Sequence, residues 1–408
     1  MAMVNPNTND EKMKPSKHIP FDLISENILP RFPVKSLIRF TSVCKEWETL
    51  IKSPEFIATH FKRNNRPESE GQYPLILSNK LSYTVKNQIA IYFDKLGSMS
   101  GCSLNDDYPA EHCNGLILIK VLKENYGGSE IEFLLWNPSI KKSIIIESFY
   151  PRVYMHNRRR SESGYDVRGL GFHESSNDYR VVKIKYTHVK KKVSSRVKIY
   201  SLRTNMWRNV DSNPDGLMGF RGGVFLNGSV HWLATRMYSY GAYIGCAPNE
   251  YEIESILSFD FEKECFGEMK LPKDFAERSA SPAGLVAFKE FQGSLAAVFI
   301  DYDVDKCFVW VMGEYGVTDS WNKKMTIRFP KNCSSPLGFT KNGMLVCEDK
   351  KVSGFIFLDS EKFEEYVNCD DDNMEIEDSN DDNSEDESFG EESHVMVIDY
   401  MESLALLE

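Results

Sequence analysis

The sequence predicts a small all-α segment at residues 18–62, followed by an all-β propeller over residues 73–369. Three observations support this fold class. Apolar residues of the first segment recur at spacings of three and four, which is typical of amphipathic helices. The second segment holds short stretches rich in Val, Ile, Tyr and Phe between turn pairs, which indicates strands. These stretches recur about every 57 residues, a period typical of propeller blades with four short strands each.

The overall composition is that of an ordinary globular protein, with 408 residues of which 41% are hydrophobic and 27% charged. No run approaches the roughly 18 apolar residues of a membrane-spanning helix. The first 17 residues are polar and lysine-rich, without the apolar core of a signal peptide. We therefore expect a protein of the cytoplasm, the nucleus or both, with no membrane partner and with residues 1–17 as a disordered lead.

The acidic charge is concentrated in one stretch. Thirteen acids and no Lys or Arg lie between Asp370 and Glu392, and removing them takes the formal net charge from −11 to +2. Because so charged a stretch buries little apolar surface, we expect residues 370–393 to be a disordered insert. The near-neutral remainder argues against a nucleic-acid partner. Residues 394–408 are expected to form a terminal strand that helps close the propeller.

The nine cysteines are scattered, odd in number and never spaced Cys-x-x-Cys. This pattern predicts reduced, mostly buried thiols and argues against a disulfide framework or a zinc site.

In the helical segment, an apolar stripe is formed by Leu37, Phe40, Val43, Trp47 and their neighbours Cys44, Leu50 and Ile51. Pro33 precedes the stripe, Ser36 is expected to cap its helix, and Ser53-Pro54 to end it. About 45 such residues form two or three short helices with a marginal core, so the segment should dock either on its own body or on a partner. Residues 63–72 are charged and contain Pro and Gly, which predicts a linker.

The repeat is marked by turn pairs that begin at residues 114, 177, 227, 292 and 342. Asn-Gly supplies the positive φ angles of a tight hairpin, which explains why such pairs recur at one place in the unit. Five copies are visible. Strand-like stretches near both ends of the body suggest a sixth blade, to which both chain ends contribute. The alternative is an irregular pair of β-sandwiches.

No catalytic, cofactor or metal site is predicted. His173-Glu174 begins like a zinc-protease motif, but Asn177 stands where the second histidine belongs. Gly169 and Gly171 begin like a dinucleotide fingerprint that lacks its third glycine. His112-Cys113 precedes a strand and is expected to be structural.

Candidate substrate contacts lie in two kinds of loop. Two basic clusters contain Arg159 and Lys191, and could meet an acidic partner, including the chain's own insert at 370–393, or be solvated hairpin tips. A tyrosine-rich insertion at residues 236–251 contains Tyr238, Tyr240 and Tyr243. Tyrosine gives contact area at small entropic cost, so this loop could bind a partner or pack on a neighbouring blade.

The helical segment resembles an F-box. The resemblance rests on Ile19-Pro20, Asp22-Leu23, Ile28-Leu29, the run Pro33-Val34-Lys35-Ser36-Leu37, Arg39-Phe40, Val43-Cys44-Lys45, Trp47 and Ser53-Pro54. The body adds weaker echoes such as CNGLILI, LWNPSIKK and GGVFLNGSVHWLA. The whole chain is thus similar to plant F-box proteins with a kelch-like F-box-associated domain, including S-locus F-box-like proteins and those that control immune-receptor levels. One departure is an extra residue between Asp22 and Pro33, with Pro30 where the first helix normally continues.

The resemblance implies a substrate-recognition subunit of an SCF ubiquitin ligase, in which the F-box docks on a Skp-type adaptor that links it to cullin and RING subunits. The propeller would then hold a protein substrate, without performing chemistry. Seven residues would be divided between the adaptor interface and the helices' own packing: Pro20, Leu23, Val34, Leu37, Phe40, Val43 and Trp47. Val34 and Leu37 are the leading contact candidates, and Trp47 is expected to be mainly internal. The alternatives are a tether or decoy in a non-degradative complex, and a propeller enzyme.

Overall fold

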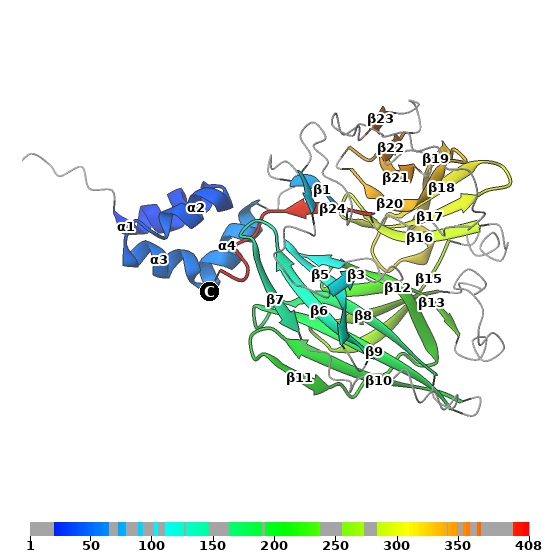
Figure 1. Cartoon of the computed structure of the whole chain (residues 1–408), viewed down its shortest axis with the longest axis horizontal. Coiled ribbons are helices and arrows are strands. Elements are labelled where there is room, and N and C mark those ends of the chain that lie inside the picture. Colours follow the sequence, from blue (N-terminus) through cyan, green and yellow to red (C-terminus); the bar gives the residue numbers. More distant parts are fainter. Residues whose placement is uncertain are drawn as a thin grey trace, which may run out of the picture.

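The computed structural model describes residues 20–64, 72–78, 89–92, 102–104, 111–125, 128–146, 163–189, 192–236, 255–272, 284–340, 342–349, 354–359, 365–368 and 395–407 (Figure 1). The predicted lead at 1–17 and insert at 370–393 lie outside these ranges, as does most of the predicted linker at 63–72. Helices gather at one end of the molecule, and the strands form the rest (Figure 1).

Residues 20–64 form a helical module. Its elements are α1 (Phe21–Leu23), η1 (Ile24–Ile28), η2 (Leu29–Arg31), α2 (Val34–Phe40), α3 (Lys45–Lys52) and α4 (Pro54–Asn64). Ser53 ends α3 as predicted, and its hydroxyl caps α4 by accepting a 3.2 Å hydrogen bond from the Phe56 N–H. The expected cap by Ser36 is wrong, because α2 begins at Val34 after Pro33 and has no side-chain cap at its N-cap residue.

A π-helical turn occupies the position of the extra residue before Pro33. Residues Ile24–Ile28 are π-helical, and Leu29–Arg31 then tighten into a 3₁₀ turn. A π turn holds one more residue than the α-helical path it replaces, so it absorbs an insertion without ending the helix. Pro30 lies in the first turn of η2, where a missing N–H costs little. The added residue is therefore accommodated locally.

The strands that the structure describes form six separate sheets. The first contains β3 (Cys102–Leu104), β5 (Leu116–Asn125), β6 (Gly128–Asn137) and β7 (Lys142–Ile146), with β4 (Glu111–Cys113) also on β5. The second contains β8 (Ser163–His173), β9 (Asp178–Val189), β10 (Lys192–Ser201) and β11 (Met206–Asn209). The third contains β12 (Leu217–Leu226), β13 (Ser229–Arg236), β14 (Ser255–Asp260) and β15 (Cys265–Lys270). The fourth contains β16 (Gly284–Phe291), β17 (Ser294–Asp301), β18 (Lys306–Met312) and β19 (Trp321–Arg328). The fifth contains β20 (Cys333–Phe339), β21 (Leu345–Asp349), β22 (Gly354–Leu358) and β23 (Glu365–Asn368).

These five sheets are antiparallel blades, so the chain is a β-propeller. The sixth sheet has three described strands: β24 (Val395–Met401) pairs antiparallel with β1 (Gln72–Ser78), which pairs in parallel with β2 (Ile89–Tyr92). The predicted six blades are therefore corrected to five complete blades and one three-stranded sheet. A parallel pair cannot be joined by a tight hairpin, so within the described residues this sheet departs from the antiparallel pattern of the other five.

The turn pairs of the repeat are mostly tight hairpins. At Asn114-Gly115, Asn227-Gly228 and Gln292-Gly293 both central residues have positive φ, as a type I′ turn requires. The prediction is wrong at Asn177, which is the last residue of a four-residue turn between β8 and β9. At residue 342 only the following glycine has a positive φ, in a wider turn closed by the Thr340 N–H donating to the Met344 carbonyl.

Hydrophobic side chains fill the spaces between blades. Gly169 and Gly171 of β8 lie against the third blade, where a Cβ at residue 171 would fall 1.9 Å from the Phe261 ring and one at 169 would fall 2.6 Å from Trp232. The Trp232 indole N–H donates 2.7 Å to the Arg168 carbonyl in the same interface. These glycines serve close packing between blades, which is consistent with rejecting the dinucleotide motif.

Among the cysteines whose side chains the structure describes, six are free thiols. Cys113, Cys307, Cys333 and Cys347 are buried. Within the part of the chain that the structure describes, no helix has the length and apolar composition needed to cross a bilayer.

The helical module lies against one edge of the propeller. The Asn177 side chain donates 3.4 Å to the Pro54 carbonyl, and Ile140 packs against the core of the module. The neighbouring turns join this edge: Tyr179 donates to the Asn114 carbonyl, and Ser175 donates to Glu262. We call this the proximal edge. The opposite ends of the same strands form the distal edge, where the β9–β10 hairpin points away from the helices (Figure 1).

Candidate functional site

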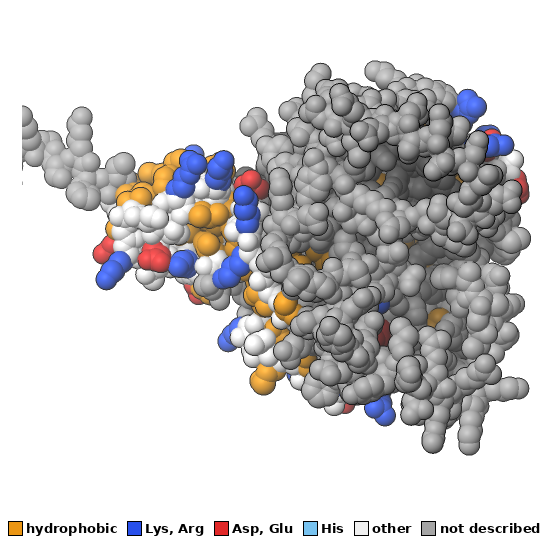
Figure 2. All heavy atoms as spheres, in the orientation of Figure 1, with side chains coloured by type: hydrophobic (Ala, Val, Ile, Leu, Met, Phe, Trp, Pro, Cys, Tyr) orange, Lys and Arg blue, Asp and Glu red, His pale blue; other side chains and the backbone are white. Residues whose placement is uncertain are grey.

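An apolar patch is exposed on the helical module. Five large hydrophobic side chains are between 36% and 61% accessible there: Phe21, Leu23, Ile28, Phe32 and Val43. The module is small, and this number of exposed apolar side chains is unusual for a surface that faces only water. Figure 2 shows orange side chains gathered over the module, with blue basic side chains beside them. The patch has the composition of a protein-binding surface.

The structure separates the predicted adaptor contacts into three groups. Pro20, Leu23 and Val43 are exposed. Phe40 and Trp47 are half-buried. Val34 and Leu37, the leading contact candidates, have no accessible surface at all and belong to the core of the module. A fully buried side chain cannot contact a partner, so these two residues serve the folding of the helices.

Aromatic rings connect the patch to that core. The ring of Phe40 lies 5.1 Å from the exposed Phe32 ring and 5.5 Å from Trp47, both in edge-on geometry. Such pairs hold aromatic side chains in one orientation. Phe32 is therefore presented on a packed support, which reduces the entropy lost when a partner binds.

A buried histidine fixes the backbone beneath the patch. His60 of α4 is 1% accessible, and its Nε2 lies 2.9 Å from the Phe32 carbonyl oxygen. Burial lowers the pKa of His60, so the ring is neutral and its Nε2–H donates to that carbonyl. The loop between η2 and α2 is thus tied to α4.

Sequence reasoning missed Phe21, Ile28 and Phe32. They lie outside the helical stripe that begins at Leu37, and such a stripe marks the side of a helix that its own fold buries. The signal available was the reverse one: large apolar residues that fall off the stripe. Basic side chains accompany them, since Arg31, Lys35 and Arg39 are all exposed.

The predicted substrate contacts lie outside the described residues. This applies to Arg159, Lys191, Tyr238, Tyr240 and Tyr243.

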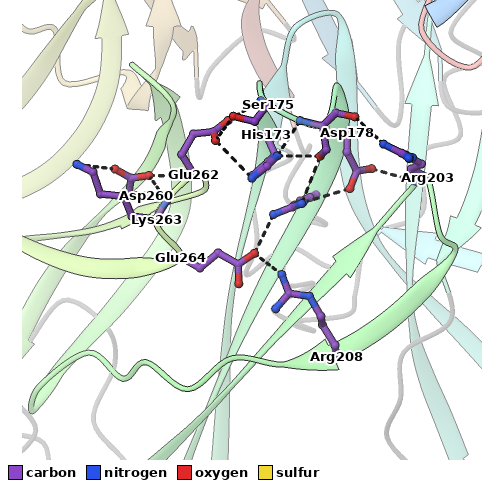
Figure 3. A network of polar contacts seen from close by, with 11 residues as sticks. His173, Ser175, Asp178, Arg203, Arg208, Asp260, Glu262, Lys263 and Glu264 are labelled. Atoms are coloured by element: carbon purple, nitrogen blue, oxygen red, sulfur yellow. Dashed lines mark hydrogen bonds and ion pairs between the residues drawn. The ribbon is translucent and has the colours of Figure 1, made fainter.

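A polar cluster joins the second and third blades at the proximal edge (Figure 3). His173 Nδ1 lies 2.7 Å from the Ser176 hydroxyl, and His173 Nε2 lies 3.4 Å from a Glu262 carboxylate oxygen. Arg180 bridges Asp178 at 3.1 Å and Glu264 at 2.8 Å. Arg208 pairs with the same oxygen of Glu264. Serine, histidine and a carboxylate in contact resemble a nucleophilic triad, so the geometry needs a closer test.

Equivalent turns show what His173 does. Its Nδ1 accepts a hydrogen bond from the Ser176 backbone N–H at 3.2 Å. In the corresponding hairpins the Asp260 carboxylate accepts from the Lys263 N–H at 2.9 Å, and the Ser201 hydroxyl accepts from the Thr204 N–H at 3.2 Å. The last residue of a strand thus caps the turn that follows, whichever polar side chain supplies the acceptor. His173 fills that structural role, and its Glu262 contact fastens one blade to the next.

One buried carboxylate connects three blades. Glu111 of β4 is 2% accessible and accepts hydrogen bonds from the Leu170 N–H of β8 at 2.8 Å and the Gly223 N–H of β12 at 3.3 Å. Arg168 Nε lies 3.8 Å away. Burial raises the pKa of Glu111 to about 7. Among the described residues no group of three or more His, Cys, Asp or Glu side chains is placed to hold a metal ion.

Comparison with known proteins agrees with both modules. The F-box domain family matches residues 18–59, and the F-box associated beta propeller domain family matches residues 94–407. An F-box/kelch-repeat protein of Arabidopsis thaliana is 27% identical over 76% of this chain and 79% of that protein. The Arabidopsis thaliana F-box protein CPR1 is 26% identical over 84% of this chain and 82% of its own length.

Solved structures match less closely. The Penicillium chrysogenum alpha-L-arabinanase is 11% identical with a TM-score of 0.37, over 73% of this chain and 86% of that one, which is too distant to inform on chemistry. The family matches, in contrast, span both modules that the structure describes. The chain belongs to the plant-type F-box proteins that carry an F-box-associated β-propeller domain.

Proposed function

We propose that the protein is the substrate-recognition subunit of an SCF-type ubiquitin ligase complex. The helical module docks on a Skp-type adaptor, which connects it to cullin and RING subunits, and the propeller holds a protein substrate. The chain brings the substrate to the transferring enzyme and performs no chemistry of its own. Such a protein acts in the cytoplasm, the nucleus or both.

The observation that carries this proposal is the exposed apolar patch on the F-box. Val43 is 61% accessible and Leu23 is 49% accessible. Truncating or charging such side chains has little effect on folding but removes binding energy when a partner covers them. The exposed Arg31, Lys35 and Arg39 beside the patch favour an adaptor surface that is acidic around an apolar centre.

A non-catalytic role is supported by the polar cluster of the second and third blades. Its serine, histidine and carboxylate groups are engaged in capping turns and in holding blades together. Burial also raises the pKa of the Cys113 and Cys307 thiols, which disfavours the reactive thiolate at these buried positions.

The distal edge is the proposed substrate face. The strands β13 and β14, which flank the tyrosine-rich segment, meet it through Arg236 and Ser255, at the ends opposite the Asn227-Gly228 turn. The strands β9 and β10 approach the predicted basic cluster at that edge in the same way. Loops there would hold a substrate away from the adaptor, which leaves room for the conjugating enzyme between them.

The test is co-purification of the full chain with a plant Skp-type adaptor, comparing Val43→Asp with Val304→Asp. Both valines are exposed, at 61% and 51%, but Val304 lies in the β17–β18 turn of the propeller. We expect the intact chain and Val304→Asp to retain the adaptor and Val43→Asp to lose it, with unchanged thermal unfolding of all three. Equal retention by the two variants, or no retention by the intact chain, would sink the proposal.

A further inference from the structure

The last residues of the described chain lie between the F-box and the propeller. We call Glu402–Leu407 the C-terminal segment; it follows β24 and runs beside α4 toward the first blade (Figure 1). We infer that this segment is a positioning element, which completes the F-box core and fixes the F-box to the propeller as one rigid unit. The inference rests on the proposed function only for what the F-box binds.

One side chain of the segment enters the F-box core. Leu404 has no accessible surface and packs in a cluster with Leu29, Val34, Leu37, Ile51 and Phe56 of the helices. All other fully buried members of this cluster come from the F-box itself. A module of about 45 residues has a small core, so a buried leucine from elsewhere in the chain contributes a substantial share of it.

The next two side chains point the other way. Ala405 and Leu406 are 3% and 8% accessible and pack in the cluster of the first and second blades, with Leu116, Leu135 and Tyr200 among its members. Successive residues of one short segment thus belong to two different hydrophobic cores. Separating the F-box from the propeller would expose one of these sets to water.

A buried asparagine of the first blade holds the backbone of the segment. Asn137, which has no accessible surface, donates from Nδ2 to the Ser403 carbonyl at 2.9 Å and to the Ala405 carbonyl at 2.7 Å. Its Oδ1 accepts from the Ser139 N–H at 3.0 Å. This arrangement fixes the orientation of the amide, because the reversed one would place an oxygen against two carbonyl oxygens.

Further contacts hold the C-terminal segment in place. The Ser403 N–H donates to the Ser139 hydroxyl at 3.2 Å, and the Ala405 N–H donates to the Ser403 hydroxyl at 3.1 Å. The Asn114-Gly115 turn also lies against the segment, because a Cβ at residue 115 would lie 2.4 Å from the Ser403 Cβ. The carbonyl and N–H of Ser403 thus bond to the first blade, and its hydroxyl bonds within the segment. Buried polar groups are normally hydrogen-bonded in this way.

The decisive variant is Asn137→Asp in the full chain. Aspartate has the same shape, but as a carboxylate it cannot donate to the two carbonyl oxygens that the amide satisfies. Asn213→Asp is the matched control, because Asn213 is exposed and uses only its Oδ1, which accepts from the Asp215 N–H at 3.0 Å. A chain ending at Met401 and the milder Leu404→Ala provide two independent further variants.

Hydrogen exchange measured by mass spectrometry reports the coupling without any adaptor. We expect Asn137→Asp and Leu404→Ala to raise exchange in α2 and α4 by about tenfold or more, while β17 in the fourth blade exchanges as in the intact chain. Small-angle scattering should show a larger radius of gyration for Asn137→Asp and for the shortened chain. The radius of Asn213→Asp should equal that of the intact chain. A merely local defect of the first blade would leave both α2 exchange and the radius unchanged.

The outcomes separate this inference from the proposed function. Unchanged helix exchange and an unchanged radius in Asn137→Asp, Leu404→Ala and the shortened chain would overturn the positioning role, whatever the adaptor does. If the F-box loosens as expected but the intact chain binds no adaptor, the positioning role stands and the proposed function fails. If both hold, Leu404→Ala should also weaken adaptor retention, although residue 404 is no part of the exposed patch.

Discussion

The Glu402 carboxylate accepts a 3.3 Å hydrogen bond from the backbone N–H of Val34, although 368 positions separate the two residues in the chain. Val34 begins α2, and no side chain of the F-box itself caps that helix. The N–H groups of a first helical turn have no partner within the helix and are satisfied from outside. Here the partner comes from the C-terminal segment, so the F-box depends on the far end of the chain.

Glu402→Ala is therefore expected to destabilise the F-box more than the propeller, by about 0.5–1.5 kcal/mol for one lost hydrogen bond. Glu402→Gln retains an acceptor oxygen and should recover most of that loss. Exchange of the α2 amides in the two variants checks the prediction. Equal α2 exchange in Glu402→Ala and the parent protein would show that water replaces the carboxylate without cost.

Gly115→Ala is expected to destabilise the protein more than Gly228→Ala. Both glycines are the second residue of an Asn-Gly turn, with φ of 79° and 74°, so the backbone strain of an added Cβ is shared. At residue 115 the Cβ would also fall 2.7 Å from the Met401 carbonyl, whereas nothing lies within 4 Å at residue 228.

We expect an additional loss of about 1–3 kcal/mol at residue 115, typical of overpacking. The difference between the two midpoints of thermal unfolding measures it. Identical midpoints would mean that the C-terminal segment does not lie against the Asn114-Gly115 turn.

Much of the fold could be predicted because the relevant signals are local. Asn-Gly pairs specify type I′ turns through their positive φ, and this holds at residues 114 and 227 regardless of what surrounds them. The helical stripe likewise marked Leu37 as apolar surface that must be covered, either by the chain's own body or by a partner. Its assignment to a partner interface went wrong because the stripe alone does not say what covers it, and Leu404 arrives from a distant part of the sequence.

The candidate site was harder to predict for a related reason. A stripe of period 3.6 identifies the buried face, so a search along it finds Val34 and passes over Phe21 and Phe32. The π turn at Ile24–Ile28 also shifts the phase of the residues around it, which no α-helical spacing anticipates. Contacts such as Asn137 with Ser403 join residues 266 positions apart and leave no pattern in the sequence.

Glu111 gives the propeller a specific pH dependence. Its pKa is raised from 4.5 to about 7 by burial, so the folded state holds this proton more tightly than the unfolded chain does. The corresponding stability is present below the unfolded pKa and is lost as the pH rises through the folded one. The free energy of unfolding of the parent protein, relative to that of Glu111→Gln, should therefore fall between about pH 4.5 and 7 and stay constant above pH 7.

Thermal unfolding of both proteins at several pH values measures this difference. Glu48→Gln is the control, because the Glu48 side chain is 46% accessible and its pKa is lowered by Lys52 beside it. A difference between parent and Glu111→Gln that is flat across the interval would show that Glu111 stays ionised between its two backbone donors and Arg168.

Tyr315 fastens the β18–β19 loop of the fourth blade to the third. The buried His231 donates from Nδ1 to the Val224 carbonyl at 3.0 Å, so its Nε2 is the acceptor for the Tyr315 hydroxyl at 2.8 Å. Burial lowers the pKa of His231 to about 4, which keeps that acceptor available at neutral pH. Tyr315→Phe leaves the Nε2 atom without this donor and should cost about 1–3 kcal/mol.

Chemical denaturation compares Tyr315→Phe with Val317→Ala, a change at a 40% accessible position of the same loop. Val317→Ala should stay within about 0.5 kcal/mol of the parent, as surface substitutions usually do. Equal stability of the two variants would show that solvent satisfies the histidine as well as the tyrosine does.

The central claim is that the exposed patch of the F-box is the surface that binds a Skp-type adaptor. Its most direct test is hydrogen exchange of the full chain with and without saturating adaptor. We expect protection of the amides from Phe21 to Phe32 and around Val43, with exchange in the propeller strands unchanged. Protection confined to the propeller, or no protection anywhere in the presence of bound adaptor, would contradict it.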